Sequence, residues 1–275
     1  MYRMLGMKSN FQKVLDFCRC AGHPVYGSLQ GDIFDKSPDR VKLRLGLISE
    51  EYNELLDAVR TLNFTEVIDA LTDILYVTYG AGAEFGIDLD KTFRHLHKIR
   101  ISYYNKNNNA DIVYQGDLSN FLQMIEFNKL VGYSVYGIEQ RDIFTVRPKI
   151  VQSQLKLIKT KLELLVDSIG DKDLLGVGFG LTSLLYAVYE TGIEFGIHLD
   201  KTFEIVHNSN MTKFCSSELE AADTVKWYQK QLAENILKYK SPCYRKSADG
   251  IHWVVYDSDT DKALKSINYT PAKFD

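Results

Sequence analysis

Two similar segments decide the fold: "YGAGAEFGIDLDKTFRHLH" at residues 79–97 and "YETGIEFGIHLDKTFEIVH" at residues 189–207. They are separated by 110 positions, since 189 − 79 = 110. The same offset relates "PVYGSLQGDIF" at residues 24–34 to "SVYGIEQRDIF" at residues 134–144, with no gap between the two matches. Agreement in one register over this span indicates an internal repeat and therefore a duplicated unit.

The first repeat (about residues 8–105) has the apolar periodicity of helices. We expect Thr65 to cap the third of these helices, Gly86 to end it and Asp88 to cap the fourth. The four helices are expected at about residues 10–20, 39–60, 66–85 and 89–104.

The sequence therefore predicts an all-α fold, in which two tandem four-helix repeats form a pseudo-twofold helical bundle. After the repeats, residues 217–239 have the pattern of one more helix, and residues 252–267 that of two short strands about an Asp/Ser turn. The expected organisation is a first repeat at residues 1–107, a polar linker at 108–117, a second repeat at 118–215, and a C-terminal helix and hairpin at 216–275.

Composition limits the class of protein. The chain has 275 residues and 45% hydrophobic content, enough for a substantial core. A net charge of −3 gives no basic surplus for binding nucleic acid. The four cysteines form neither a pair of CxxC motifs nor a disulfide framework, which disfavours zinc and favours a reducing compartment. We see no apolar run approaching the roughly 20 residues that span a bilayer. We therefore expect a soluble, cytoplasmic protein with no membrane or nucleic-acid partner.

Carboxylates interrupt the apolar pattern on two consecutive helices of the first repeat. "LISEEYNELLDAV" at residues 47–59 carries three of them on one surface, and the third helix carries three more at steps of three and four. A short connector makes these helices antiparallel, so the two acidic surfaces can face each other. Hard oxygen ligands of this kind suit Mg²⁺ or Mn²⁺. The six candidate ligands are Glu50, Glu51, Glu54, Glu66, Asp69 and Asp73.

A solvated acidic helix face is the simpler interpretation of such a pattern, and the second repeat helps to separate the two. There the acids are absent: the positions of Glu50, Glu51, Glu54, Asp69 and Asp73 hold Thr160, Lys161, Leu164, Phe179 and Ser183. Asp90, by contrast, recurs as Asp200, and Asp57 recurs as Asp167. We expect these recurrent aspartates to be structural.

At these residues the chain resembles a known superfamily. "SEEYNELLDAV" (49–59) followed by "EVIDALTDILYVTYGAG" (66–82) is similar to the ExxE and ExxD helices of the all-α nucleoside triphosphate pyrophosphohydrolases, which include MazG, dimeric dUTPase and phosphoribosyl-ATP pyrophosphohydrolase. "FEIVHNSNMTKF" (203–214) resembles the VHxSNMxK signature of the MazG-like, phosphoribosyl-ATP-pyrophosphohydrolase-like branch. "KALKSINYTPAKF" (262–274) is similar to the C-terminal tail of that branch.

The resemblance implies a reaction and a set of roles. A nucleoside triphosphate would be cleaved between its α and β phosphates, giving the monophosphate and pyrophosphate, in the presence of Mg²⁺ or Mn²⁺. Glu51 and Glu54 match ExxE and would act on the attacking water, and Asp73 matches the aspartate of ExxD. Asp69 stands one residue before the usual position of the other ExxD acid. The implied metal ligands are Glu50, Glu51, Glu54, Asp69 and Asp73.

Asn210 and Lys213 of the second repeat would bind the substrate. His207 has His97 at the equivalent position, so an ordinary structural role is favoured for it. Asn268 and Tyr269 in the tail would either close over the site or simply pack.

The repeats have lost complementary parts, because the first reads "HKIRISYY" at residues 97–104 where the second reads "HNSNMTKF". Since related enzymes place active sites between subunits, the chain is expected to act as a fused dimer with one composite site. This fused pseudo-dimer can itself form a homodimer. Two alternatives stay open: a catalytically retired nucleotide-binding or scaffolding protein, and a phosphoribosyl-ATP pyrophosphohydrolase.

Overall fold

The computed structural model describes residues 8–114, 116, 118–233, 241–260 and 262–274. Over these residues the chain forms eleven helices and one small three-stranded sheet, so the predicted all-α fold with a short C-terminal hairpin is confirmed. The chain divides into two compact units, each described here by itself. The first contains Met1–Gln12 and Tyr26–Phe203, and the second contains Lys13–Val25 and Glu204–Asp275. Helices α1 (Asn10–Ala21) and α10 (Leu199–Met211) contribute residues to both units.

The first repeat is built on a pair of long helices, α3 (Pro38–Arg60) and α4 (Phe64–Phe85), preceded by the single turn α2 (Ile33–Lys36). Pro38 stands at the first helical position, where its missing N–H costs nothing. The three-residue connector between α3 and α4 forces them to run antiparallel, and the two helices pack along their length. Their buried faces carry Ile48 and Leu55 on α3 and Val67 and Leu71 on α4.

The cap of α4 differs from the sequence prediction. Asn63, rather than Thr65, is the N-cap, and its side-chain oxygen accepts a hydrogen bond from the Glu66 N–H at 3.2 Å. Asn63 serves better because it lies directly after the sharp turn at Leu62, which has a φ of 55°. At the other end Gly86 closes α4 as predicted, with a φ of +70°, and a Cβ there would lie 1.8 Å from the Ser28 carbonyl oxygen. A side chain is therefore excluded at Gly86.

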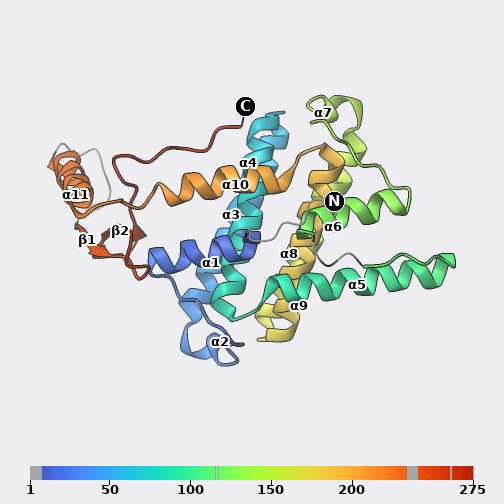
Figure 1. The fold of residues 1–275 in the computed structure, drawn as a ribbon, viewed down its shortest axis with the longest axis horizontal. Helices are drawn as coiled ribbons and strands as arrows, with labels where there is room; N and C mark the ends of the chain where they lie inside the picture. The colour runs from blue at the N-terminus through green and yellow to red at the C-terminus, as the bar shows by residue number, and fades with distance from the viewer. Residues whose placement is uncertain (1–7, 115, 117, 234–240, 261, 275) are drawn as a thin grey trace. The chain divides into compact units, whose positions relative to one another are not determined.

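The second repeat reproduces this arrangement 110 residues later. Its helices α7 (Ile143–Val146), α8 (Pro148–Gly170) and α9 (Leu174–Phe195) begin and end at the positions equivalent to α2, α3 and α4. Helices α4 and α9 pack against each other at the centre of the first unit (Figure 1). Two equivalent contacts join the repeats: the hydroxyl of Thr72 on α4 lies 2.8 Å from that of Thr202 on α10, and the hydroxyl of Thr182 on α9 lies 2.7 Å from that of Thr92, in the first turn of the helix after α4. These reciprocal contacts support the pseudo-twofold bundle.

Helices α5 (Leu89–Asn108) and α6 (Asn120–Leu130) complete the first unit, and both pack on α9. Asp88 caps α5 as predicted, by accepting a hydrogen bond from the Lys91 N–H. However, α5 extends past Tyr104 into the polar segment that was expected to be linker. The Asn105 side chain holds the following turn by two hydrogen bonds to the backbone of Ile112, at 2.9 and 3.0 Å.

Helix α9 differs from the expectation that the chain has no apolar run approaching the length that spans a bilayer. Its 22 residues make it long and apolar enough to cross a membrane by length and composition alone. Yet 72% of its most apolar window is buried inside the protein. Its apolar character follows from its position between α4, α5, α6 and α8 as a core helix.

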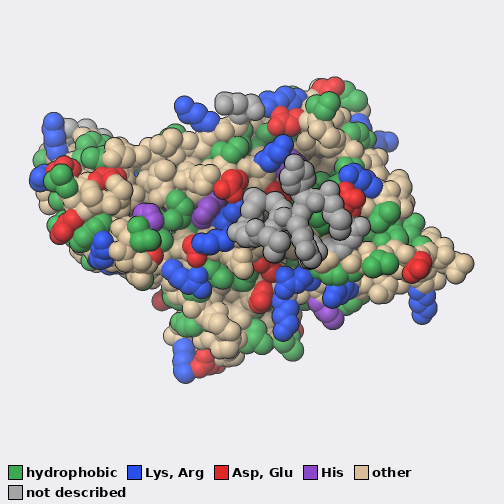
Figure 2. Space-filling model, in the orientation of Figure 1, with side chains coloured by type: hydrophobic (Ala, Val, Ile, Leu, Met, Phe, Trp, Pro, Cys, Tyr) green, Lys and Arg blue, Asp and Glu red, His purple; other side chains and the backbone are tan. Residues whose placement is uncertain are grey.

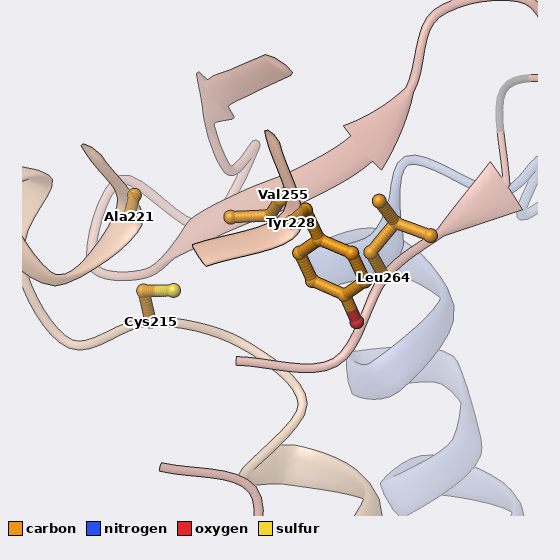
Figure 3. Packing of buried hydrophobic residues seen from close by; sticks show 5 residues of the cluster. All are labelled: Cys215, Ala221, Tyr228, Val255 and Leu264. Atoms are coloured by element: carbon orange, nitrogen blue, oxygen red, sulfur yellow. The ribbon is translucent and has the colours of Figure 1, made fainter. Parts of the chain in front are cut away.

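The second unit joins helix α11 (Glu218–Ala233) to the antiparallel strands β1 (Pro242–Lys246), β2 (Trp253–Asp257) and β3 (Lys262–Ala263). The expected last turns of the helix, beyond Ala233, reach residues 234–239, which lie outside the described residues. Strands β2 and β3 are the predicted pair, whereas β1 was not predicted. Helix α11 packs on β1 and β2, and Figure 3 shows the apolar cluster of this unit. Its buried residues are Cys215, Ala221, Tyr228, Val255 and Leu264.

Candidate active site

The six predicted acids, called the acidic cluster below, all lie on the α3–α4 pair. Three are on α3, where Glu50 and Glu54 are exposed and Glu51 is half-buried. Three are on α4, where Glu66 is exposed, and Asp69 and Asp73 are half-buried. The members of the cluster are Glu50, Glu51, Glu54, Glu66, Asp69 and Asp73.

Asp69 shows that acids from the two helices come together. Its pKa is raised above the ordinary aspartate value, first because the carboxyl is partly buried. The negative charges of Glu66, on the same helix, and of Glu54, on the facing helix, raise this pKa further. Since Glu54 lies on the facing helix, its effect on Asp69 agrees with acidic surfaces of α3 and α4 that face each other.

This donor set fits a hard divalent cation. It offers carboxylate oxygens only, three of its six members are half-buried, and it carries mutual repulsion that a cation would relieve. Over the described part of the chain, the acids do not form a group of three with oxygens all within 4.8 Å of one another. Mutually repelling carboxylates are expected to stay apart until a cation neutralises them.

A buried ion pair at the other end of the same helices was missed by the sequence analysis. Glu84 on α4 is 1% exposed and accepts hydrogen bonds from Arg40 and Arg44 of α3. A signal for it existed, since a glutamate surrounded by alanine, glycine and phenylalanine near the end of α4 must be paired when it is buried. These contacts lock α3 against α4 and so support the surface that carries the acids.

The two predicted substrate-binding residues belong to the second unit. Asn210 lies in the last turn of α10 and Lys213 just beyond it, both half-buried, and the Lys213 N–H donates to the Asn210 carbonyl at 3.1 Å. The Lys213 ammonium also lies 5.9 Å from the centre of the Phe17 ring. The structure does not place this unit's residues relative to the acidic cluster.

The C-terminal tail is tied to the same motif within the second unit. The Ser209 hydroxyl donates to the Thr270 carbonyl at 2.8 Å, and the Thr270 N–H donates to the Thr212 hydroxyl at 2.9 Å. The backbone of Lys213 also accepts a hydrogen bond from the Ser266 N–H at 3.0 Å. Residues 203–214 and 262–274, the two segments that resemble one branch of the superfamily, are thus hydrogen-bonded to each other.

Another cluster of potential ligand atoms was not expected. Cys20, Asp249 and His252 place ligand atoms within 4.8 Å of one another. Burial, together with the nearby Asp249 carboxylate, raises the pKa of the Cys20 thiol to about 12, so the thiol stays protonated. It donates to Asp249 at 2.9 Å, and His252 Nδ1 is hydrogen-bonded to the same carboxylate at 2.5 Å. These bonds join the end of α1 to the β1–β2 turn, a structural role.

Three second-repeat positions equivalent to members of the acidic cluster, Lys161, Phe179 and Ser183, line an open cavity of about 380 Å³, called the second-repeat cavity below. Its walls come from α5 of the first repeat and from α8 and α9 of the second. The lining residues used below are Arg100, Tyr103, Lys161, Phe179, Ser183 and Glu190.

Acidic and basic side chains are interspersed over the face of the molecule shown in Figure 2, so no broad surface of one charge sign is seen on that face.

Comparison with known proteins places this fold and acidic surface in a class of nucleotide-cleaving enzymes. Residues 30–100, which contain the whole acidic cluster, match the phosphoribosyl-ATP pyrophosphohydrolase family. This match places residues 30–100 in the phosphoribosyl-ATP pyrophosphohydrolase family and, through it, in the MazG-like nucleoside triphosphate pyrophosphohydrolase superfamily. The family points to a pyrophosphohydrolase, a hydrolase of acid anhydrides, with nucleotide substrates.

A relative extends the similarity to nearly the whole chain. The uncharacterized protein L479 of Acanthamoeba polyphaga mimivirus is 35% identical over 258 residues, which cover 94% of this chain and 91% of the relative. No solved structure matches the chain.

Proposed function

We propose that the protein hydrolyses a nucleoside triphosphate to the monophosphate and pyrophosphate at a single site built on the acidic cluster. The observation that supports this most directly is the raised pKa of Asp69, caused in part by Glu54 on the facing helix. Carboxylates that raise the pKa of Asp69, one of them from across a helix pair, in a segment that matches a pyrophosphohydrolase family, are the arrangement expected of a site for Mg²⁺ or Mn²⁺.

The acidic cluster would hold the cation through Glu50, Glu51, Glu54, Asp69 and Asp73. A divalent cation there supplies charge neutralisation for phosphate oxygens and lowers the pKa of a bound water. Glu51 or Glu54 would position the attacking water and accept its proton. The water oxygen would bond to one of the two phosphorus atoms of the α–β bridge as that bridge breaks, so that the monophosphate and pyrophosphate are released.

The equivalent surface in the other repeat, around the second-repeat cavity, supports a composite site. On α5, Arg100 and Tyr103 occupy the positions equivalent to Asn210 and Lys213, since 210 − 100 and 213 − 103 both equal 110. They line the second-repeat cavity together with Lys161, so there α5 of the first repeat faces the α8–α9 helix pair of the second. The twofold-related arrangement would bring Asn210 and Lys213 to the acidic cluster, with Lys213 acting as a point charge on phosphate.

The test is pyrophosphate release from a panel of ribo- and deoxyribonucleoside triphosphates with Mg²⁺. We expect Glu54→Gln to reduce release by at least about 100-fold, since removal of a general base costs roughly 10²–10⁴-fold. The matched control is Glu163→Gln, an exposed glutamate on α8 that pairs with Lys159 at 3.6 Å. No release from any nucleotide, or equal release from wild type and Glu54→Gln, would favour the retired, nucleotide-binding alternative.

A second candidate substrate is favoured by the family match itself. Residues 30–100 match phosphoribosyl-ATP pyrophosphohydrolase, so phosphoribosyl-ATP belongs in the panel. A value of kcat/KM for phosphoribosyl-ATP well above the values for all simple triphosphates would assign the chain to that reaction. The same acids would serve it, because the bond cleaved is of the same kind.

A further inference from the structure

The second-repeat cavity has the size of a small-molecule site, although its repeat lacks the acids. Ligand pockets usually enclose about 300–1,000 Å³, and this cavity of about 380 Å³ falls within that range. It lies wholly in the first unit, and each of its lining residues is described. Where the second repeat lacks the acids, the space between α5, α8 and α9 is therefore an open cavity and not a packed core.

The charge of the cavity is opposite to that of the acidic cluster. Lys161 stands where the first repeat has Glu51, and Ser183 stands where it has Asp73. Arg100 and Glu190, also in the lining, pair with each other at 3.1 Å. The remaining cation, Lys161, gives the lining a positive balance, which disfavours a metal ion and favours an anion.

Aromatic side chains surround this charge. Phe179 replaces the metal-ligand candidate Asp69 and is 54% exposed, and Tyr103 is 72% exposed. Large aromatic rings exposed at the rim of a cavity offer flat apolar surfaces on which a planar ring can stack. Tyr186 lies deeper in the lining, with the Arg100 guanidinium carbon 5.1 Å from its ring centre. The cavity thus combines stacking surfaces with one cationic group, Lys161, beyond the Arg100–Glu190 pair.

We propose that the second-repeat cavity binds a nucleoside monophosphate without a metal ion, with the phosphate at Lys161 and the base against Phe179 or Tyr103. This proposal rests on the proposed function, because the monophosphate is the product released at the acidic cluster. A triphosphate suits the cavity less well, since its charge would normally be neutralised by Mg²⁺ and the carboxylates that hold Mg²⁺ are absent here.

Binding is measured by calorimetry in EDTA, with a panel of ribo- and deoxyribonucleoside monophosphates as probes. Inorganic phosphate and the matching nucleosides serve as fragments, and each is expected to bind at least about tenfold more weakly than the best monophosphate. Lys161→Ala is expected to weaken binding about tenfold, as loss of a charged hydrogen bond does. Phe179→Ala is expected to weaken it by a similar factor. Lys159→Ala is the matched control, because Lys159 is an exposed lysine on the same helix outside the cavity.

The Glu51→Gln, Glu54→Gln double variant separates the two proposals. Binding in EDTA that survives in this variant, and that Lys161→Ala weakens, supports the inference even when no pyrophosphate release is found. Binding that is insensitive to both Lys161→Ala and Phe179→Ala overturns the inference even when hydrolysis is confirmed. So does the absence of binding by all monophosphates in EDTA.

Discussion

The phenolic oxygens of Tyr79 and Tyr189 lie 2.9 Å apart, and the two tyrosines occupy equivalent positions in the repeats. Around them the contacts are reciprocal. The Asn120 amide donates to Tyr79 and to Asp90, and the Asn10 amide donates to Tyr189 and to Asp200. Ser9 and Ser119 complete the pattern by donating to Asp90 and Asp200 in turn. Asp90 and Asp200 are therefore hydrogen-bonded structural groups, as expected from their presence in both repeats.

This symmetry predicts that substitution of either tyrosine lowers the free energy of unfolding by the same amount. Tyr79→Phe and Tyr189→Phe each remove the shared hydrogen bond, and one bond from an asparagine amide, from a fully buried site, so each should lower the free energy of unfolding by about 1–2 kcal/mol. The double variant should cost less than the sum, because the bond can be lost only once. Urea unfolding of the three variants gives the values. Strict additivity, or a large cost for one tyrosine alone, would contradict a shared bond.

Asp69 predicts how stability changes with pH and metal. Its folded-state pKa is raised above the ordinary value of 3.8, so its favourable contribution is complete below that pH and is lost as the pH rises through the folded pKa. At neutral pH without metal, Asp69→Asn should therefore unfold at a higher temperature than wild type. Mg²⁺ should stabilise wild type more than the variant. Thermal unfolding in EDTA and in Mg²⁺ across pH provides the comparison, and a destabilised variant in EDTA would argue against repulsion within the acidic cluster.

His97 predicts the opposite dependence on pH. Burial, and then the charge of Arg100, lower its pKa from 6.5 to about 4, and its Nδ1 lies 2.6 Å from the Tyr186 hydroxyl. Its stabilising contribution is complete above pH 6.5 and is lost as the pH falls from 6.5 towards 4. The loss for wild type should be on the order of 3 kcal/mol over this window. In His97→Gln this part of the acid destabilisation should disappear. Urea midpoints measured between pH 7 and pH 4 would show parallel curves if His97 were already charged in the folded state.

Much of the fold follows from local signals. Pro38 and Gly86 mark the outer ends of the α3–α4 pair because their backbone requirements are local. Strand β1 escaped prediction because its segment has weak strand character and is fixed by pairing with β2, where Tyr244 lies opposite Val255. The Asn63 cap was not predicted because it depends on the left-handed turn at Leu62, and a leucine does not indicate such a turn in a sequence.

The site was predictable to a different degree. Helical spacing placed the acidic cluster on two facing surfaces, and the effect of Glu54 on Asp69 agrees with this. The second-repeat cavity was not predictable, since substitution by Phe179 and Leu164 suggests a filled core. Phe179 instead remains half-exposed at the rim, which only the three-dimensional packing reveals.

Metal stoichiometry tests the assignment of the acids. We expect one main Mg²⁺ or Mn²⁺ site per chain, because only the first repeat retains the carboxylates. Calorimetric titration should show this site abolished in the Glu51→Ala, Glu54→Ala double variant. The equivalent double variant of the second repeat, Lys161→Ala with Leu164→Ala, is the matched control and should bind metal as wild type does. Undiminished metal binding in the acid double variant would remove the basis of the proposed site.

The composite site gives the prediction that is easiest to contradict, because it depends on the complementary losses of residues in the two repeats. If Lys213 served the acids of its own repeat, the first repeat would have carboxylates without the lysine, and the second would have the lysine without carboxylates. If Lys213 instead serves the acidic cluster of the other repeat, one site is whole. Lys213→Ala should then weaken substrate binding or turnover at least about tenfold while leaving metal affinity unchanged, since an ammonium is not a metal ligand.

Lys226→Ala, an exposed lysine on α11, controls for loss of charge in the second unit. The decisive measurement pairs Lys213→Ala with Glu54→Gln in a double-mutant cycle on kcat/KM. Effects that are far from additive indicate that both residues act on one bound triphosphate. Full additivity, or a Lys213→Ala variant with wild-type kinetics, would place Lys213 outside the site and leave the acidic cluster to act without the second repeat.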